Sequence, residues 1–135
     1  MSLVVDASVT LPWMLPDEST PIALAKRARV IKEGGLVPQH WRLEICNGLL
    51  MAARRRRYNL AHMNADLEAL AGLPILVDPH TNDASWEETA ALARSFKLTA
   101  YDAAYLELAR RNGLHLATFD AELAKAARKA GVKVV

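Results

Sequence analysis

The sequence is poor in cysteine and has no long apolar run. Cys46 is the single cysteine among 135 residues, so an intrachain disulfide and a cysteine-rich zinc site are both excluded. A reducing cytoplasm fits this composition best. No apolar run approaches the ~20 residues that a membrane-spanning helix needs. The first residues reach Asp6 without the basic stretch of a signal peptide, so we expect a cytoplasmic protein with no membrane segment.

An excess of charge of one sign is also lacking, since the formal net charge is +2. Hydrophobic residues make up 52% of the chain, which argues against disorder and favours one compact domain over residues 1–135. The basic residues are nevertheless grouped, at positions 26–32, at 125–129 and in the unbroken run Arg54, Arg55, Arg56 and Arg57. A basic surface around an acidic centre would attract a polyanion such as RNA.

Short apolar runs alternate with longer helical patterns along the chain. Thr20-Pro21, for example, supplies a cap residue and a first-turn proline, which predicts a helix start. Strands separated by helices indicate an α/β fold with a mainly parallel central sheet of about five strands, flanked by helices on both faces. Strands are predicted at about 3–5, 36–38, 75–77, 114–118 and 132–135. Helices are predicted after Asp6 and at about 21–33, 40–58, 60–73, 83–96, 100–112 and 121–130.

Three aspartates stand where such a fold would bring them together. Asp6 directly follows the first predicted strand, and Asp120 follows the fourth. Ligands bind beyond the carboxyl ends of the strands in open parallel sheets, so both should lie on that edge. Asp102 falls in the first turn of a helix that starts at the same edge. Taken singly, Asp6 and Asp120 are equally well explained as helix N-caps, and Thr99-x-x-Asp102 is a capping-box pattern.

Glu44 is the acid that structure alone explains least. The helix from Trp41 to Ala53 is apolar on nearly all sides, with Arg42, Glu44 and Asn47 as its only strongly polar residues. A carboxylate buried there would need a partner, because an unpaired buried charge is costly. A metal ion is one candidate, whereas Arg42 is two residues away and points elsewhere on the helix.

Grouped carboxylates suit a hard divalent cation. Mg²⁺ prefers oxygen ligands, and two such ions clamp the attacking and leaving oxygens of a phosphodiester. Without metal, four neighbouring carboxylates would repel one another and some would hold protons. Ser8, Asn47 and Thr118 stand beside three of the acids and are predicted to orient carboxylates or metal-bound water. Helix capping and turn formation are the alternative for these three.

Four short blocks surround the acids in chain order. They read Val4-Val5-Asp6-Ala7-Ser8-Val9, Leu43-Glu44-Ile45-Cys46-Asn47-Gly48-Leu49, Leu98-Thr99-Ala100-Tyr101-Asp102-Ala103-Ala104-Tyr105-Leu106 and Leu116-Ala117-Thr118-Phe119-Asp120-Ala121-Glu122-Leu123. Together, over essentially the whole length, the chain resembles the PIN-domain ribonucleases, and more closely the VapC-type toxins of toxin–antitoxin pairs.

This resemblance implies a three-layer PIN-like fold and a homodimer that hydrolyses RNA with Mg²⁺ or Mn²⁺ and a metal-activated water. It implies inhibition by a cognate antitoxin. Some relatives carry a further acid near the fourth, for which Glu122 is the nearest candidate here. By the same resemblance the metal ligands and catalytic residues are Asp6, Glu44, Asp102 and Asp120.

Two other classes of function stay open. A phosphatase or receiver domain also places Asp at strand ends, although the row Asp6-Ala7-Ser8 lacks the Asp-x-Asp of such a phosphatase. A PIN module without catalysis, binding RNA or protein, is the other class.

Several basic and apolar residues outside the four blocks also have two interpretations. The run Arg54 to Arg57 is predicted to place favourable charge at a helix C-terminus, with RNA-phosphate contact as the alternative. The segment Trp13-Met14-Leu15 is predicted as core, with an antitoxin groove as the alternative. The four histidines show no metal-ligand spacing, and we interpret them as structural or surface residues.

Overall fold

The computed structural model describes residues 3–135. Within them, a sheet is built from β1 (Leu3–Val5), β2 (Gly35–Val37), β3 (Ile75–Val77) and β4 (His115–Ala117). All neighbouring strands pair in parallel, in the order β3-β2-β1-β4. The predicted α/β fold with a parallel sheet is therefore confirmed.

The expected fifth strand at 132–135 is reduced to one parallel bridge between Leu116 and Val134. Both backbone hydrogen bonds of this contact fall on Leu116, which donates to the Lys133 carbonyl and accepts from the Val135 N–H, each at 2.9 Å. Only one register position is thus paired, which is too little for a strand. The sheet of the described residues has four strands, and the prediction of about five was slightly too high.

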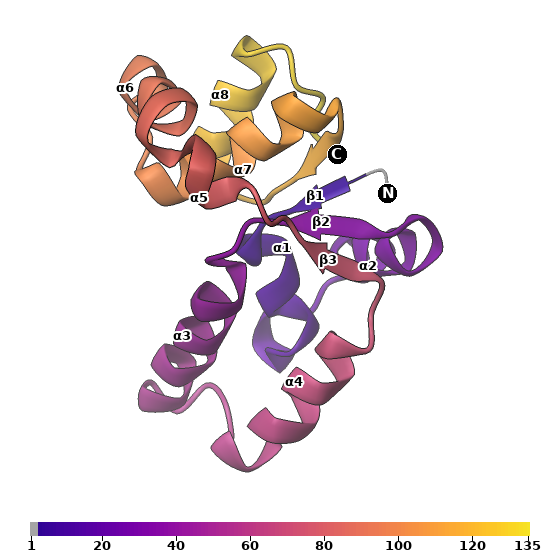
Figure 1. Cartoon of the computed structure of the whole chain (residues 1–135). Helices are drawn as coiled ribbons and strands as arrows, with labels where there is room; N and C mark the ends of the chain where they lie inside the picture. The colour runs from indigo at the N-terminus through magenta and orange to yellow at the C-terminus, as the bar shows by residue number, and fades with distance from the viewer. Residues whose placement is uncertain (1–2) are drawn as a thin grey trace.

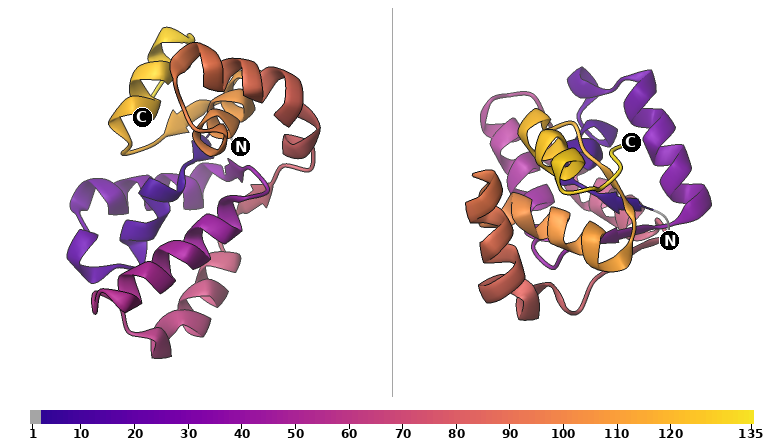
Figure 2. Two further views of the ribbon diagram at one scale, coloured as in Figure 1. Left: turned by 90° about the vertical axis from the view of Figure 1, so that its left-hand side faces the viewer. Right: turned by 90° about the horizontal axis from the view of Figure 1, so that it is seen from above.

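Helices cover both faces of the sheet (Figure 1). On one face α7 (Ala100–Asn112) packs against β1 and β4, α8 (Ala121–Lys129) packs on α7, and α5 (Thr81–Ala84) and α6 (Ala90–Phe96) complete the layer. On the other face lie α1 (Ala7–Thr10), α3 (Trp41–Arg54) and α4 (Met63–Ala71). Beside them α2 (Pro21–Glu33) contacts α1. The turned views in Figure 2 show the same two helical layers on either side of the sheet, so the fold has three layers.

Local signals in the sequence account for most helix ends. The Thr20 hydroxyl accepts from the Ala23 N–H at 3.1 Å, and Gly113 adopts the left-handed conformation that ends α7, as predicted. The long helix predicted to Tyr58 ends at Arg54, because Arg56 turns to a positive φ of 58°. The helix predicted over 83–96 runs without a gap from Thr81 to Phe96, as α5, a π-helical turn at Ser85–Thr89, and α6.

The buried core sets the position of α3 relative to α1. The strand residues Leu3, Val4 and Val5 are fully buried, as is Leu49 on the inner side of α3. A Cβ atom on Gly48 would stand 2.6 Å from the Leu11 side chain, so glycine allows α3 to approach the 3-10 turn Leu11–Trp13 that follows α1. Two further 3-10 turns lie at Pro16–Glu18 and Leu60–His62. No helix within residues 3–135 is long and apolar enough to cross a membrane.

Candidate metal centre

Asp6 lies at the carboxyl end of β1, next to the end of β4. Its backbone N–H donates to the Ala117 carbonyl at 3.0 Å, continuing the β1–β4 ladder by one residue. The Asp6 residue is only 4% exposed, and its Oδ2 accepts from the hydroxyls of Ser8 and Thr118, each at 2.7 Å. Asp6 makes no side-chain capping hydrogen bond to α1. The Asp6 carboxylate is therefore held by Ser8 and Thr118 and does not cap α1.

Ser8 and Thr118 also hold the loop that leads to the fourth acid. The Phe119 N–H donates to Ser8 Oγ at 2.9 Å, and the Asp120 N–H donates to Thr118 Oγ1 at 3.0 Å. Each hydroxyl thus donates to Asp6 and accepts from a backbone N–H of the β4–α8 loop. These four hydrogen bonds fix Asp6 and Asp120 relative to one another.

The capping alternatives have different outcomes for the other two aspartates. Asp120 Oδ1 accepts from the Leu123 N–H at 2.8 Å, so Asp120 is the N-cap of α8. Its second oxygen takes no part in this cap. At α7 the cap is Thr99, whose hydroxyl accepts from the Asp102 N–H at 3.1 Å. The Thr99 half of the predicted capping box is thus formed, with Asp102 in the first turn of α7.

Glu44 is held by Tyr105 on α7 and by His40, the N-cap residue of its own helix. The expectation that α3 is apolar and enclosed on nearly all sides is wrong, because Leu43 is 73% exposed and Asn47 is exposed as well. Only one side of α3 faces the core. The Glu44 side chain is 32% exposed, and its Oε1 accepts from Tyr105 Oη at 2.7 Å and lies 3.2 Å from His40 Nε2.

His40 and Tyr105 form part of the site without having been identified from the sequence. The His40 ring packs edge-on against Tyr105, with 5.4 Å between ring centroids, and against Tyr101 at 5.6 Å. Its Nε2 also lies 3.1 Å from the Tyr101 carbonyl oxygen. The helical spacing was available as a signal, since His40 stands four residues before Glu44 and Tyr105 three after Asp102.

The charges of Asp6, Glu44 and Asp120 act on Asp102. Burial raises the pKa of Asp102, and the neighbouring charges of Asp6, Asp120 and Glu44 raise it further, to about 6, against a smaller lowering by the Thr99 hydrogen bond. Burial likewise raises the pKa of Asp6, and the charges of Glu44 and Asp120 act in the same direction, while the two hydroxyl hydrogen bonds oppose them. Burial, followed by the charges of Glu44 and Asp6, raises the pKa of Tyr105. Acids from four different segments of the chain therefore repel one another at one place.

Among residues 3–135, no group of three or more His, Cys, Asp or Glu side chains is placed so that it could hold a metal ion. Asp6, Glu44 and Asp120 are each directed to their own hydrogen-bond donor. The four carboxylates nevertheless suit a hard cation in their chemistry, because carboxylate oxygens are the ligands that Mg²⁺ prefers. The donors to Asp6 are hydroxyls and the donor to Asp120 is a backbone N–H, so neither brings a positive charge. A divalent cation would remove the repulsion that raises the pKa of Asp102.

Comparison with known proteins agrees with the fold. Residues 3–129 match the family model of the PIN domain. The chain belongs to the PIN-domain family. Ribonuclease VapC3 of Mycobacterium tuberculosis is 31% identical to this PIN domain over 124 residues, which are 92% of this chain and 86% of the relative.

Solved structures show the same fold. PAE2754 from Pyrobaculum aerophilum superposes with a TM-score of 0.71 at 28% identity, covering 100% of this PIN domain and 84% of that chain. FitAcB from Neisseria gonorrhoeae has a TM-score of 0.63 at 21% identity, covering 98% and 95%. The Mycobacterium tuberculosis toxin VapC20, which cleaves the sarcin–ricin loop, has a TM-score of 0.60 at 20% identity, covering 93% and 95%. At these identities the last two support the fold alone.

Three other features singled out in the sequence have no contact with the four acids among the hydrogen bonds and ion pairs of the described residues. Asn47 is exposed and, among the described residues, makes no hydrogen bond to any of the four acids. The arginine run begins ten residues after Glu44 on α3, about 15 Å further along the helix axis. Arg57 there binds Asp17 at 2.7 Å and Glu18 at 2.8 Å, which offsets its charge. Glu122 is exposed in the first turn of α8.

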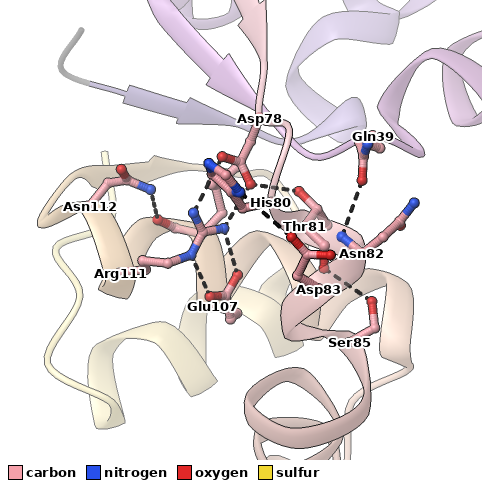
Figure 3. A network of polar contacts seen from close by, with 11 residues as sticks. Gln39, Asp78, His80, Thr81, Asn82, Asp83, Ser85, Glu107, Arg111 and Asn112 are labelled. Atoms are coloured by element: carbon pink, nitrogen blue, oxygen red, sulfur yellow. Dashed lines mark hydrogen bonds and ion pairs between the residues drawn. The ribbon is translucent and has the colours of Figure 1, made fainter.

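A cleft of about 850 Å³ lies elsewhere, between α5, α6 and α7. Beside it Arg111 joins two nearly buried acids, with Nη2 at 2.7 Å from Asp78 Oδ2 and Nε at 2.7 Å from Glu107 Oε1 (Figure 3). Thr81 also donates to Asp78 at 2.9 Å. Burial acts to raise the pKa of Asp78, but the hydrogen bonds from Arg111 and Thr81 outweigh it and lower the pKa. Arg111 bonds to both acids, so the cluster connects the end of β3 to α7 and each of the two carboxylates has a partner.

Proposed function

We propose that this PIN domain is a metal-dependent endoribonuclease, the toxin of a toxin–antitoxin pair. The proposed ligands of Mg²⁺ or Mn²⁺ are Asp6, Glu44, Asp102 and Asp120. The observation that carries the proposal is the edge of the sheet in this PIN domain, where the Ser8 and Thr118 hydroxyls hold Asp6 beside Asp120. The 31% identity with Ribonuclease VapC3 over 92% of the chain supports RNA as the substrate.

A bound Mg²⁺ or Mn²⁺ supplies Lewis-acid stabilisation of phosphate oxygens and lowers the pKa of the water that attacks the phosphodiester. The chain's own residues orient the ligands. Ser8 and Thr118 hold Asp6 through Oδ2. Tyr105 and His40 hold Glu44 through Oε1. Asp120 is fixed because its Oδ1 caps α8, and its Oδ2 is left as a ligand for the metal ion. Such orienting partners commonly change metal affinity 10- to 100-fold when they are removed.

The proposed partners are RNA, a cognate antitoxin and a second copy of the chain in a homodimer, in the cytoplasm. Arg54, Arg55 and Arg56 are exposed and are proposed to contact phosphates of an RNA that extends beyond the acids. Co-expression with the neighbouring small open reading frame tests the antitoxin, with growth rescue and co-purification as the readouts.

The purified protein should cleave RNA with Mg²⁺ or Mn²⁺ and stop when EDTA is added. Asp6→Asn should abolish cleavage and weaken Mn²⁺ binding in calorimetry. Asp83→Asn is the matched control, because Asp83 has an 82% exposed side chain and lies outside the cluster. Cleavage by Asp6→Asn at the rate of the wild type would refute the assignment. A PIN module without catalysis should show no metal site, and phospho-aspartate formation with acetyl phosphate would point to a phosphoryl-transfer domain.

A further inference from the structure

A pocket of about 450 Å³ opens between α1, the start of α2 and the β4–α8 loop. Its apolar lining comes from the turn after α1, from the first turn of α2 and from the loop before Asp120. We call it the Phe119 pocket, formed by Ser8, Leu11, Pro12, Thr20, Ile22 and Phe119.

The Phe119 pocket and the acidic cluster share Ser8 as a link. Ser8 lines the pocket and donates to Asp6 at 2.7 Å. The Phe119 N–H donates to the same Ser8 hydroxyl at 2.9 Å, and Phe119 directly precedes Asp120. A group seated in the pocket would therefore be one side chain away from two of the acids.

The surface of the pocket is apolar, aromatic and close to a cation. Phe119 is 43% exposed and Ile22 is 65% exposed, although both are large apolar side chains. The Lys26 ammonium stands 5.6 Å from the centroid of the Phe119 ring. Glu18 also lines the pocket and is paired at 2.8 Å with Arg57, which it shares with Asp17. An aromatic face beside a lysine is the combination that binds single-stranded nucleic acids, because bases stack on the ring and the cation meets the phosphate.

We propose that the Phe119 pocket receives an unpaired base of the RNA, beside the phosphate held at the acidic cluster, and that Lys26 contacts a neighbouring phosphate. This inference rests on the proposed function. It makes the substrate a single-stranded or looped RNA, because a base inside a duplex has both faces stacked and cannot enter. Stacking on Phe119 tolerates any base, since every base has a π face. We expect the Phe119 pocket to position the RNA chain next to the cleaved bond more than to select one base.

Anisotropy with a labelled single-stranded oligonucleotide tests the pocket, in an Asp6→Asn background so that the RNA stays intact. Adding Phe119→Leu should weaken binding about tenfold, which is the order of one lost base–aromatic stack. Adding Phe119→Trp should keep the affinity. Trp86→Leu is the matched control, because Trp86 is 93% exposed and does not line the pocket. Lys26→Met should weaken binding and lower the slope of log affinity against log salt by about one.

An abasic sugar, moved along the oligonucleotide, identifies the seated base. At one position the abasic sugar should lower the affinity of the protein that keeps Phe119 about tenfold. It should lower the affinity of the Phe119→Leu variant little, because the missing base and the missing ring remove the same contact. Equal losses in both proteins at every position would overturn the pocket, as would equal affinity for a duplex and a single strand. Weakened antitoxin binding by Phe119→Leu with unchanged RNA binding would assign the pocket to a peptide and also overturn it. The proposed function fails separately, if the wild type cleaves no RNA in Mg²⁺ or Mn²⁺.

Discussion

The Asp6 carboxylate accepts a 2.7 Å hydrogen bond from the Thr118 hydroxyl, across 112 residues of sequence. The contact exists because β1 and β4 are parallel neighbours that end at the same edge of the sheet. The same hydroxyl accepts from the Asp120 N–H at 3.0 Å, so one side chain orients two of the acids. Thr118 is thus the structural link between the first and the fourth acidic block.

Thr118→Val should weaken Mn²⁺ binding about tenfold, because Asp6 loses a donor that orients its carboxylate. Loss of the hydrogen bonds should also lower the free energy of unfolding by about 1–2 kcal/mol. Calorimetry and thermal unfolding measure the two effects. Thr89→Val is the matched control, since the buried Thr89 hydroxyl has no hydrogen-bond partner among the described residues. That variant should leave metal affinity unchanged and should not destabilise the fold. Unchanged Mn²⁺ affinity in Thr118→Val would contradict the orienting role.

Tyr105→Phe should separate metal binding from fold stability at Glu44. Tyr105 Oη donates to Glu44 Oε1 at 2.7 Å, so its loss frees the carboxylate and should reduce Mn²⁺ affinity and RNA cleavage about tenfold. Tyr58→Phe removes a similar hydrogen bond, from Tyr58 Oη to Asp66 at 2.5 Å, away from the four acids. The Tyr58→Phe variant should have a lower free energy of unfolding and an unchanged Mn²⁺ affinity. Equal Mn²⁺ affinities of the two variants would show that Tyr105 has no special role.

Stability without metal should depend on pH through Asp102. Its pKa is raised from 3.8 to about 6, so between these values the folded protein binds more protons than the unfolded chain. The free energy of unfolding contributed by this group therefore falls as pH rises through about 4 to 6. The raised pKa of Asp6 acts in the same direction.

Thermal unfolding in EDTA at several pH values, compared between wild type and Asp102→Asn, isolates this contribution from that of other acids. The variant should gain stability relative to the wild type as pH rises to 7. Mg²⁺ should stabilise the wild type more than the variant, because it offsets the repulsion. A constant difference across the pH range would disprove the coupling of Asp102 to the other acids.

Arg111→Met should destabilise the fold by about 3 kcal/mol, because it leaves Asp78 and Glu107 buried without their counter-charge. Denaturant unfolding measures the loss. Arg110→Met, at the exposed neighbouring position, should be nearly neutral. Both variants should keep the Mn²⁺ affinity of the wild type at temperatures where they are folded. A specific loss of metal binding in Arg111→Met would mean that the Figure 3 cluster contributes to the site.

Much of the fold could be predicted because its signals are local. The apolar run Leu3–Val5, the cap at Thr20 and the left-handed Gly113 each act within a few residues, and the structure confirms all three. The extent of pairing at 132–135 could not be predicted in this way, because it depends on how much of the last segment reaches Leu116.

The sequence by itself determined the order of the strands and helices and the four acids at their ends. The tertiary structure alone decided which groups meet. Leu43 is exposed because the rotation of α3 is set by packing, and the partners of Glu44 come from His40 on its own N-terminal side and from Tyr105 on α7. The Phe119 pocket likewise joins segments more than 90 residues apart. Periodicity and caps act between near neighbours in the chain, whereas contacts across the sheet edge follow from how the whole core packs.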